Sequence, residues 1–229
     1  MGRGNVVMAG GVNRFITWNL NGFNETINGL SHTGPGESCI ILNNGPQPSV
    51  LTVGDNDQSA TFGGRIQDGS SQVSLVKIGS GVQTLTGPCT YSGPTTVRAG
   101  TLALSGAGSI SSSPVIHVEN GARLDVAGVE GGFTHLGEIT LTGGTLSIRN
   151  TQPPGLQRLT LEGGRLEFVS LSETAAVEVA TLTTAGDSNV IDIVRIGTVP
   201  AYPAVFPLVR YQALQGVGFN FVLGQMPGA

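Results

Sequence analysis

Three acidic residues lie close together in the sequence and could bind a divalent cation. Asp55 and Asp57 flank an asparagine directly after Gly54, and Asp68 follows in the next segment. A D-x-D loop offers the carboxylate oxygens that Ca²⁺ takes as ligands. The glycine-rich nonapeptide of calcium-binding repeats is absent, however, and an Asp-Asn pair after glycine is also a good turn. We keep Asp55 and Asp57 as a calcium candidate beside this simpler interpretation.

Pairs of carboxylates could also perform acid–base chemistry on a polysaccharide. Glycoside hydrolysis requires two carboxyl groups roughly 5–9 Å apart across the scissile bond. The candidates Glu162 and Glu167, or Glu119 and Asp125, are spread singly over the solvent-facing sides of the predicted strands, which favours solvated surface positions. The serine-rich run 109–113 reads as a loop before Pro114, and no nucleophile elbow, phosphate loop or HExxH motif occurs. We therefore predict no catalytic residues, no cofactor and no enzymatic activity.

The cysteines and histidines are too dispersed to form a metal site. Cys39 and Cys89 are fifty residues apart without any CxxC pairing, and His32, His117 and His135 are scattered. A Cys39–Cys89 disulfide remains open as an alternative, but two small buried thiols are the favoured interpretation.

The charge balance excludes several classes of partner. The chain has 11 Lys and Arg against 15 Asp and Glu, a net charge of −4, and its cations are not clustered. It therefore lacks the basic patch of a nucleic-acid-binding protein. No apolar run approaches the roughly 18–20 residues of a membrane-spanning helix. The first residues lack a signal peptide, so either an export signal was removed or the sequence is a piece of a longer chain.

The elements that must position these residues are predicted to be short strands separated by glycine turns. The sequence has 36 glycines among 229 residues, yet 39% of residues are apolar and only 11% are charged, which argues against disorder. Apolar residues alternate with polar ones in many segments, which is the period of a strand with one buried face. Val177 and Val179 follow this pattern around Glu178. Signals for helices are nearly absent.

An internal repeat has a period of about twenty residues. Residues 139–148 (ITLTGGTLSI) align without gaps to residues 159–168 (LTLEGGRLEF). Related units place central leucines at positions 85, 102, 124, 141, 161 and 182. Sandwiches usually show turn signals every 8–12 residues, whereas a β-solenoid stacks one coil of repeated sequence on the next. We prefer the solenoid to a sandwich or barrel because it explains why leucine recurs at equivalent positions.

One segment carries a longer and more specific motif. Residues 75–87 read LVKIGSGVQTLTG, and residues 89–102 continue as CTYSGPTTVRAGTL. Together with residues 61–74 this segment resembles the passenger-associated repeat of bacterial autotransporters. Its motif positions here are Lys77, Gly79, Gly81, Tyr91, Ser92, Gly93 and Gly100. We interpret the glycines as corners of a close-stacked backbone and Tyr91 as a structural corner residue.

The resemblance implies an exported right-handed parallel β-helix without catalytic residues. We therefore predict an all-β solenoid of about ten coils stacked about 4.8 Å apart, with an irregular antiparallel C-terminal end as an added option. The predicted single domain divides into N-terminal coils (1–60), the passenger-associated repeat (61–104), regular coils (105–196) and a C-terminal end segment (197–229). Cys89 departs from the family pattern, because it places a thiol in a turn.

The predicted function is structural. We expect a non-enzymatic module at the bacterial cell surface or outside the cell, because solenoid ends expose unpaired strands that can pair with other chains. Its expected partners are further copies stacked head to tail into fibres, or neighbouring surface proteins. An adhesin that binds glycans through a solvent-facing surface is the alternative, and polysaccharide cleavage is a third hypothesis. No nucleic acid and no membrane span are expected.

Overall fold

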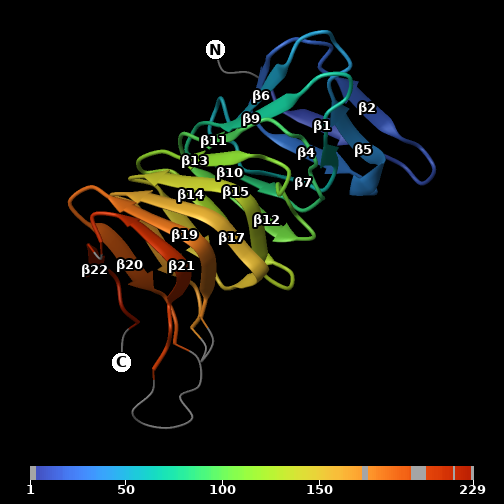
Figure 1. Ribbon diagram of the computed structural model, residues 1–229. Helices are drawn as coiled ribbons and strands as arrows, with labels where there is room; N and C mark the ends of the chain where they lie inside the picture. Colours follow the sequence, from blue (N-terminus) through green and yellow to red (C-terminus); the bar gives the residue numbers. More distant parts are fainter. Residues whose placement is uncertain (1–3, 172–174, 197–204, 219, 228–229) are drawn as a thin grey trace.

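A computed structural model of the chain describes residues 4–171, 175–196, 205–218 and 220–227. The chain winds into a stack of coils in which the strands of each coil pair with the same strands of the next (Figure 1). All strand pairs in the described part of the chain are parallel. The predicted parallel β-solenoid is thus confirmed.

Two long sheets form the main faces of the stack. Over the described residues, the larger sheet contains nine strands: β3 (Glu25–Ile27), β6 (Ser49–Val53), β9 (Val73–Lys77), β11 (Thr95–Val97), β13 (Val115–Val118), β15 (Phe133–Thr142), β17 (Thr151–Glu162), β19 (Val177–Ala185) and β21 (Val209–Gly216). The opposing sheet contains eight: β7 (Ala60–Phe62), β10 (Val82–Leu85), β12 (Thr101–Gly106), β14 (Arg123–Val129), β16 (Thr145–Ile148), β18 (Arg165–Phe168), β20 (Asn189–Ile193) and β22 (Phe221–Leu223).

Two smaller sheets complete the N-terminal coils. One pairs β1 (Val6–Ala9) with β4 (Leu30–Thr33), and the other stacks β2 (Ile16–Asn19), β5 (Cys39–Leu42) and β8 (Arg65–Ile66) as a third face. A single short 3₁₀ helix, η1 (Gly36–Ser38), is the only helix in the described residues. The near-absence of helix signals in the sequence agrees with this structure.

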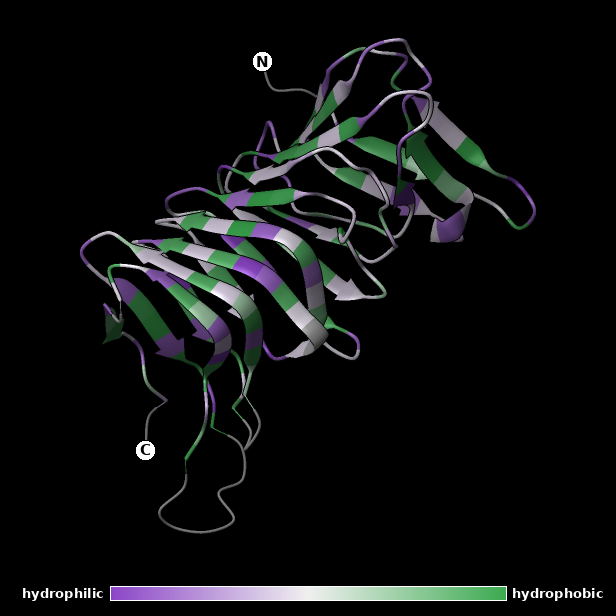
Figure 2. Cartoon of the chain, in the orientation of Figure 1, coloured by the Kyte–Doolittle hydropathy of each residue, from purple (hydrophilic) through white to green (hydrophobic). Residues whose placement is uncertain are grey.

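The core is a set of apolar columns that run along the solenoid axis. Leu102, Leu124, Leu146 and Leu166 stack in register on four successive strands, and none of them is exposed. Figure 2 shows the alternation of hydrophobic and hydrophilic residues along the strands that points one face inward. Each fully buried leucine contributes roughly 1.5–3 kcal/mol relative to an exposed one, so these columns dominate the stability of the stack.

The twenty-residue repeat corresponds to one coil. Ile139 pairs with Leu159, and Leu146 pairs with Leu166, so the two aligned segments lie in register on neighbouring coils. Each segment crosses from the larger sheet to the opposing sheet through its Gly-Gly pair. The list of central leucines mixed the two sheets, however. Leu124 stacks on Leu102 in one sheet, whereas Leu141 stacks on Leu161 in the other, so the differences between neighbouring positions in that list are not all coil lengths.

Two further expectations need correction. Eight full turns connect the nine strands of the larger sheet among the described residues, slightly fewer than the expected ten coils. The option of an antiparallel C-terminal end was wrong, because β21 pairs parallel to β19 and β22 parallel to β20. Residues 197–204 of the predicted C-terminal end segment lie outside the described residues. The expected strand around Val177 is confirmed as β19.

A seam interrupts the stack between the second and third coils. Within the described residues, no backbone ladder joins β4 to β7. The side chain of Gln83, on β10, reaches past β7 instead. Its amide oxygen accepts the Leu30 N–H at 3.1 Å, and its amide nitrogen donates to the Leu30 carbonyl at 2.9 Å. His32 adds a second side-chain link, because its Nδ1 accepts the Gly63 N–H at 3.0 Å. Side chains therefore replace the missing ladder.

Candidate functional site

Lys77 is the most unusual residue of the predicted motif, because its side chain points into the core. It is the last residue of β9, in an inward column between Val53 and Val97, and it is not exposed. The ammonium donates to three backbone carbonyls at the adjoining corner: Ile78 at 2.6 Å, Gly79 at 2.8 Å and Ala99 at 3.2 Å. All three donors of the ammonium are thus satisfied within the fold.

The corner beside Lys77 is built from stacked glycines. Gly54, Gly79 and Gly100 all have positive φ, at 105°, 68° and 61°. A Cβ on Gly79 would lie 2.0 Å from the Gly54 carbonyl oxygen, and one on Gly100 would lie 2.4 Å from the Gly79 carbonyl oxygen. Three successive coils therefore meet here at backbone contact, which leaves no room for any side chain. Gly79 and Gly100 of the motif lie at this corner together with Gly54.

Asp57 is part of the same corner. Its carboxylate accepts the Ser80 N–H at 2.6 Å, and this hydrogen bond lowers the pKa of the carboxyl. Burial lowers the pKa of Lys77 to about 8, and the Asp57 charge partly opposes this shift. Gly81 packs directly below, where a Cβ would meet the Asp57 carbonyl oxygen at 2.3 Å. The arrangement ties the loop of one coil to the corner of the next.

The calcium candidate gains no further ligands from the fold. Among the described residues, no group of three or more His, Cys, Asp or Glu is placed to hold a metal ion. Asp55 is exposed, and Asp57 accepts a hydrogen bond from Ser80. Asp68 accepts hydrogen bonds at a different corner of the coil. The Asp68 carboxylate accepts the Val73 N–H at 2.8 Å and the Ser92 N–H at 3.1 Å. A calcium site at Asp55 and Asp57 stays a prediction.

Tyr91 begins a chain of buried hydroxyl groups. Its hydroxyl lies 2.7 Å from that of Thr95, which donates to Ser113 at 3.0 Å, and Ser113 donates to the Gly93 carbonyl at 2.9 Å. Burial raises the pKa of Tyr91, so the phenol stays neutral. Gly93 packs against Val73 at the same level, where a Cβ would lie 2.3 Å from the Val73 carbonyl oxygen. Tyr91 contacts no open surface, which agrees with a structural role.

Both cysteines are buried free thiols. Burial raises the pKa of Cys89 to about 12, which keeps this thiol protonated and unreactive. The structure thus contains the two small buried residues that the sequence favoured, and not the alternative disulfide.

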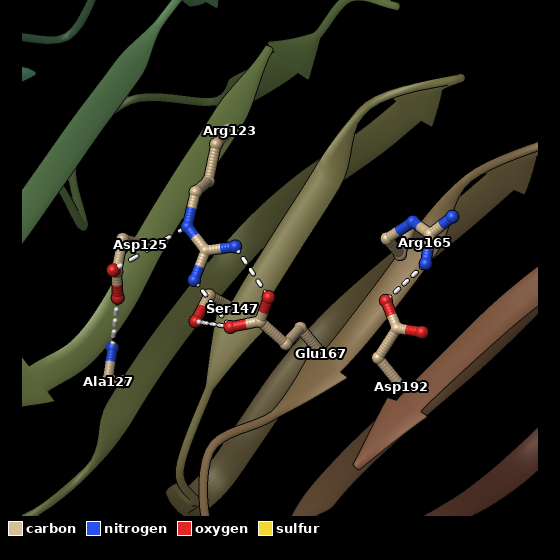
Figure 3. A network of polar contacts seen from close by, with 7 residues as sticks. All are labelled: Arg123, Asp125, Ala127, Ser147, Arg165, Glu167 and Asp192. Carbon is tan, nitrogen blue, oxygen red and sulfur yellow. Dashed lines mark hydrogen bonds and ion pairs between the residues drawn. The ribbon is translucent and has the colours of Figure 1, made fainter. Parts of the chain in front are cut away.

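A network of charged residues occupies the outer face of the eight-stranded sheet (Figure 3). Asp125, Ser147, Glu167 and Asp192 form one outward column on four successive strands. Arg123, on β14, donates to both carboxylate oxygens of Glu167, on β18, with one bond of 2.7 Å. Ser147, on the strand between them, lies buried beneath this pair and donates to Glu167 at 3.0 Å.

The network corrects one expectation. Asp125 and Glu167 are not isolated surface carboxylates, because the coil register brings both to Arg123, with Asp125 Oδ2 3.6 Å from Nε. Sequence spacing alone concealed this, since the partners are 44 residues apart. Arg165, on β18, donates through one nitrogen to Asp192 on the neighbouring strand β20 (Figure 3). Glu119 and Glu162 do lie apart, near Arg98 and Thr142.

Arginine pairing leaves the network without a free acid or base. The hydrogen bonds from Arg123 lower the pKa of Glu167 and raise that of Arg123. A general acid for glycoside cleavage needs the opposite, a raised carboxyl pKa. The network is thus built to cross-link coils, with Arg123 and Glu167 spanning the intervening strand.

One open groove lies at a corner of the stack. It has a volume of about 540 Å³ and runs between residues 106–111 and the turn that joins β14 to β15. Val129 and Leu136 supply apolar surface, Ser109 and Ser111 supply hydroxyls, and Glu130 supplies an exposed carboxylate. No lysine, arginine or histidine is among the described residues that line the groove. This lining favours neutral, hydroxyl-rich ligands over anionic ones.

The last coil exposes the interior of the solenoid. Leu182 and Ile191 form the floor of an apolar cavity of about 210 Å³, and Leu208, Val209, Tyr211 and Phe221 form its walls. Leu223 stacks on Ile191 and is 67% exposed, because no described coil covers it. The first coil is open in the same way. Its inward residues Ile16 and Trp18 are only partly buried, whereas Cys39 and Ile41 above them are not exposed.

These features define a parallel β-solenoid whose corners are held by glycines and a buried lysine. Residues 75–104, which contain Lys77, Gly79 and Gly100 of that corner, match the family model of the passenger-associated-transport-repeat. The predicted resemblance to autotransporter passenger repeats is thereby confirmed for this segment. No curated protein and no solved structure matches the chain. The repeat indicates a secreted or surface location. None of the described helices is long and apolar enough to cross a membrane.

Proposed function

We propose that the chain is a non-enzymatic structural module of a bacterial surface or secreted protein, and that copies associate through the ends of the solenoid. The passenger-associated repeat supports the structural role, since its motif residues are used inside the fold. The paired carboxylates of the outer face support the absence of catalysis.

The open ends carry the proposal of self-association. Among the described residues, β21 and β22 each lack a strand partner on the outer side, and β1, β2 and β3 do so at the other end. Unpaired strand edges are templates for pairing with other chains. Here the edges also border uncovered apolar side chains, so association would bury hydrophobic surface and complete backbone hydrogen bonds together.

Concentration series of the purified chain test this proposal. We expect the sedimentation coefficient to rise with concentration, and negative-stain micrographs to show rods whose length grows while their width stays constant. Monodisperse monomers at the highest concentrations would contradict self-association.

Incubation with acidic and neutral polysaccharides should release no reducing or unsaturated ends, and release of either would contradict the non-enzymatic role.

A second candidate function is glycan binding, and the open groove favours it. A groove with aliphatic walls, serine hydroxyls and one exposed carboxylate suits a neutral oligosaccharide. A glycan array should then show binding that Glu130→Gln weakens by about tenfold. Glu119→Gln is the matched control, because this half-buried glutamate does not line the groove. Equal binding by both variants would exclude the groove as the glycan site.

A further inference from the structure

We propose that the junction between copies is head to tail, with the first coil of one copy seated on the last coil of the next. This inference rests on the proposed self-association and specifies its partner surfaces. The alternative is a junction between two identical ends related by a two-fold axis. The strand polarity, the apolar surfaces and the corner residues of the two ends favour the first arrangement.

Strand direction is the first argument. All described strand pairs are parallel, and each coil repeats the path of the coil before it. A copy translated along the solenoid axis presents β3 to β21, and the β1–β4 face to β22, with the same polarity. The nine-stranded sheet then continues as a parallel ladder, and β1 of the separate two-stranded sheet meets β22. A two-fold axis would instead oppose identical strands in antiparallel orientation, which breaks the column pattern that the rest of the solenoid follows.

The second argument is that the two ends expose complementary parts of one apolar interior. At the C-terminal end, Tyr211 and Phe221 line the open cavity. At the N-terminal end, Val6, Ile16 and Trp18 pack against the core but remain partly exposed. Inside the stack, the inward residues of neighbouring coils cover one another almost completely. Seating the first coil on the last would give these residues the same cover.

Asparagines at one corner provide the third argument. The corner leading from the nine-stranded to the eight-stranded sheet holds Asn189 and Asn220 in the last coils, where Asn189 Nδ2 donates to Asn220 Oδ1 at 2.8 Å. Asn5 occupies the corresponding place before β1, and its Oδ1 accepts the Gly29 N–H of the next coil at 3.1 Å. A head-to-tail junction brings Asn5 of one copy, which directly precedes β1, to the same corner as Asn220 of the other, which directly precedes β22.

Trp18 makes the junction directly observable, because it is the only tryptophan in the chain. We expect its emission to shift to shorter wavelength and its quenching by acrylamide to fall at least twofold as copies associate. Leu223→Lys should abolish association by placing a charge at the end of the inward column. Val222→Lys is the matched control, because Val222 stacks on Val190 in an outward column and is 47% exposed.

A mixing experiment decides between the two junctions. Ile16→Lys should block the N-terminal end and Leu223→Lys the C-terminal end, so each variant alone should sediment as a monomer. An equimolar mixture retains one intact pair of ends and should form a dimer that grows no further. Dimer formation also shows that both variants fold, and circular dichroism of each variant checks this separately.

The outcomes separate this inference from the proposed function. A wild-type chain that stays monomeric contradicts self-association itself. Association that Leu223→Lys abolishes but Ile16→Lys leaves intact indicates a junction of identical C-terminal ends and overturns the head-to-tail arrangement. Association that resists both substitutions, or folded variants that fail to dimerise when mixed, overturns it as well.

Discussion

His135 and Lys77 are both basic residues buried in the described core, but only Lys77 is provided with partners. The Lys77 ammonium donates to three carbonyls, so its burial costs less than that of an isolated charge. His135 lies on β15, is not exposed and stacks on Phe133 with ring centroids 6.4 Å apart. Neither of its ring nitrogens has a hydrogen-bond partner in the described part of the chain.

This difference predicts a loss of stability in acid that originates at His135. Burial lowers the pKa of His135 from 6.5 to about 4, so the unfolded chain binds a proton that the folded chain rejects between these values. The contribution of the neutral imidazole is present above pH 6.5 and is lost as the pH falls toward 4. The full loss is about 3 kcal/mol in the free energy of unfolding.

Urea unfolding of wild type and His135→Leu at pH 7.5 and pH 4.5 measures this effect. The variant should lose clearly less stability in acid than the wild type does. His117→Gln is the control. Because His117 is outside the core, this variant should lose as much stability in acid as the wild type does. If His135→Leu and wild type respond equally to pH, then another group is responsible.

Sequence patterns located the motif residues but missed the unusual buried polar groups. Lys77 and Tyr91 were marked by the resemblance, although the inward direction of Lys77 was not predicted. Gln83 and His135 carried no signal, because each occupies an apolar position of an otherwise ordinary strand pattern. Their burial depends on which residues the coil register places above and below them. Register is a property of the folded stack and cannot be seen in one segment.

At the scale of elements, the corner formed by Gly54, Gly79 and Gly100 should be far more sensitive than other glycine turns. Gly79 and Gly106 both have positive φ, at 68° and 59°. A Cβ at Gly106 would meet nothing within 4 Å, whereas one at Gly79 would overlap a backbone oxygen. Gly106→Ala should therefore cost roughly 1–2 kcal/mol for the backbone conformation alone.

Gly79→Ala should cost several kcal/mol more than Gly106→Ala, because the coils must also move apart. Thermal unfolding followed by circular dichroism compares the two variants directly. Equal melting temperatures would show that the close stacking at this corner does not limit stability.

The bridge between Arg123 and Glu167 should couple two strands that are not neighbours. The side chains are 29% and 19% exposed, so solvent screens their interaction only in part. We expect a coupling free energy of about 1–2 kcal/mol in a double-mutant cycle with Arg123→Met and Glu167→Gln. Because the pKa of Glu167 is lowered, this contribution should be present at neutral pH and fall as acid protonates the carboxylate.

The same cycle on Arg98 and Glu119 is the matched control for the bridge. That pair is more exposed and its closest atoms are 3.6 Å apart, so its coupling should be near zero. Similar coupling in the two cycles would mean that spanning a strand adds nothing.

At the scale of the molecule, one coil should be removable. Deleting residues 139–158 joins Glu138 to Leu159, which pairs in register with Ile139 in the intact chain. Neighbouring coils then meet with their columns preserved, because solenoid stability is a sum over adjacent repeats. The shortened chain should keep its β-sheet circular dichroism signal and become shorter by about 4.8 Å in small-angle scattering.

A deletion of half a coil, residues 139–148, is the control for the whole-coil deletion. It removes β16 and joins β15 directly to β17, so the coil loses its strand in the eight-stranded sheet, and it should abolish cooperative unfolding. If both deletions fold equally well, the coil is not the repeating unit of stability.

The sequence period predicted the stacked architecture well but the C-terminal part poorly. Strict alternation and the Gly-Gly corners located the strands between Thr101 and Phe168, where neighbouring coils are 20 to 22 residues apart in the opposing sheet. From Leu182 to the paired Leu214 the separation grows to 32 residues. The chain leaves the repeat there and returns to the same column, so pattern spacing could not reveal that β21 continues the sheet.

The seam between β4 and β7 determines how the solenoid would respond to force. A force applied along the solenoid axis acts on every junction between neighbouring coils. Each junction resists this force through the hydrogen bonds of the strand ladders that cross it. At the seam one of these ladders is replaced by the amide of Gln83 and the imidazole of His32. The remaining ladders there are the short β5–β8 pair and the β6–β9 pair. Under axial tension, therefore, the load on this side of the stack should pass from the second coil to the third through two side chains instead of a backbone ladder.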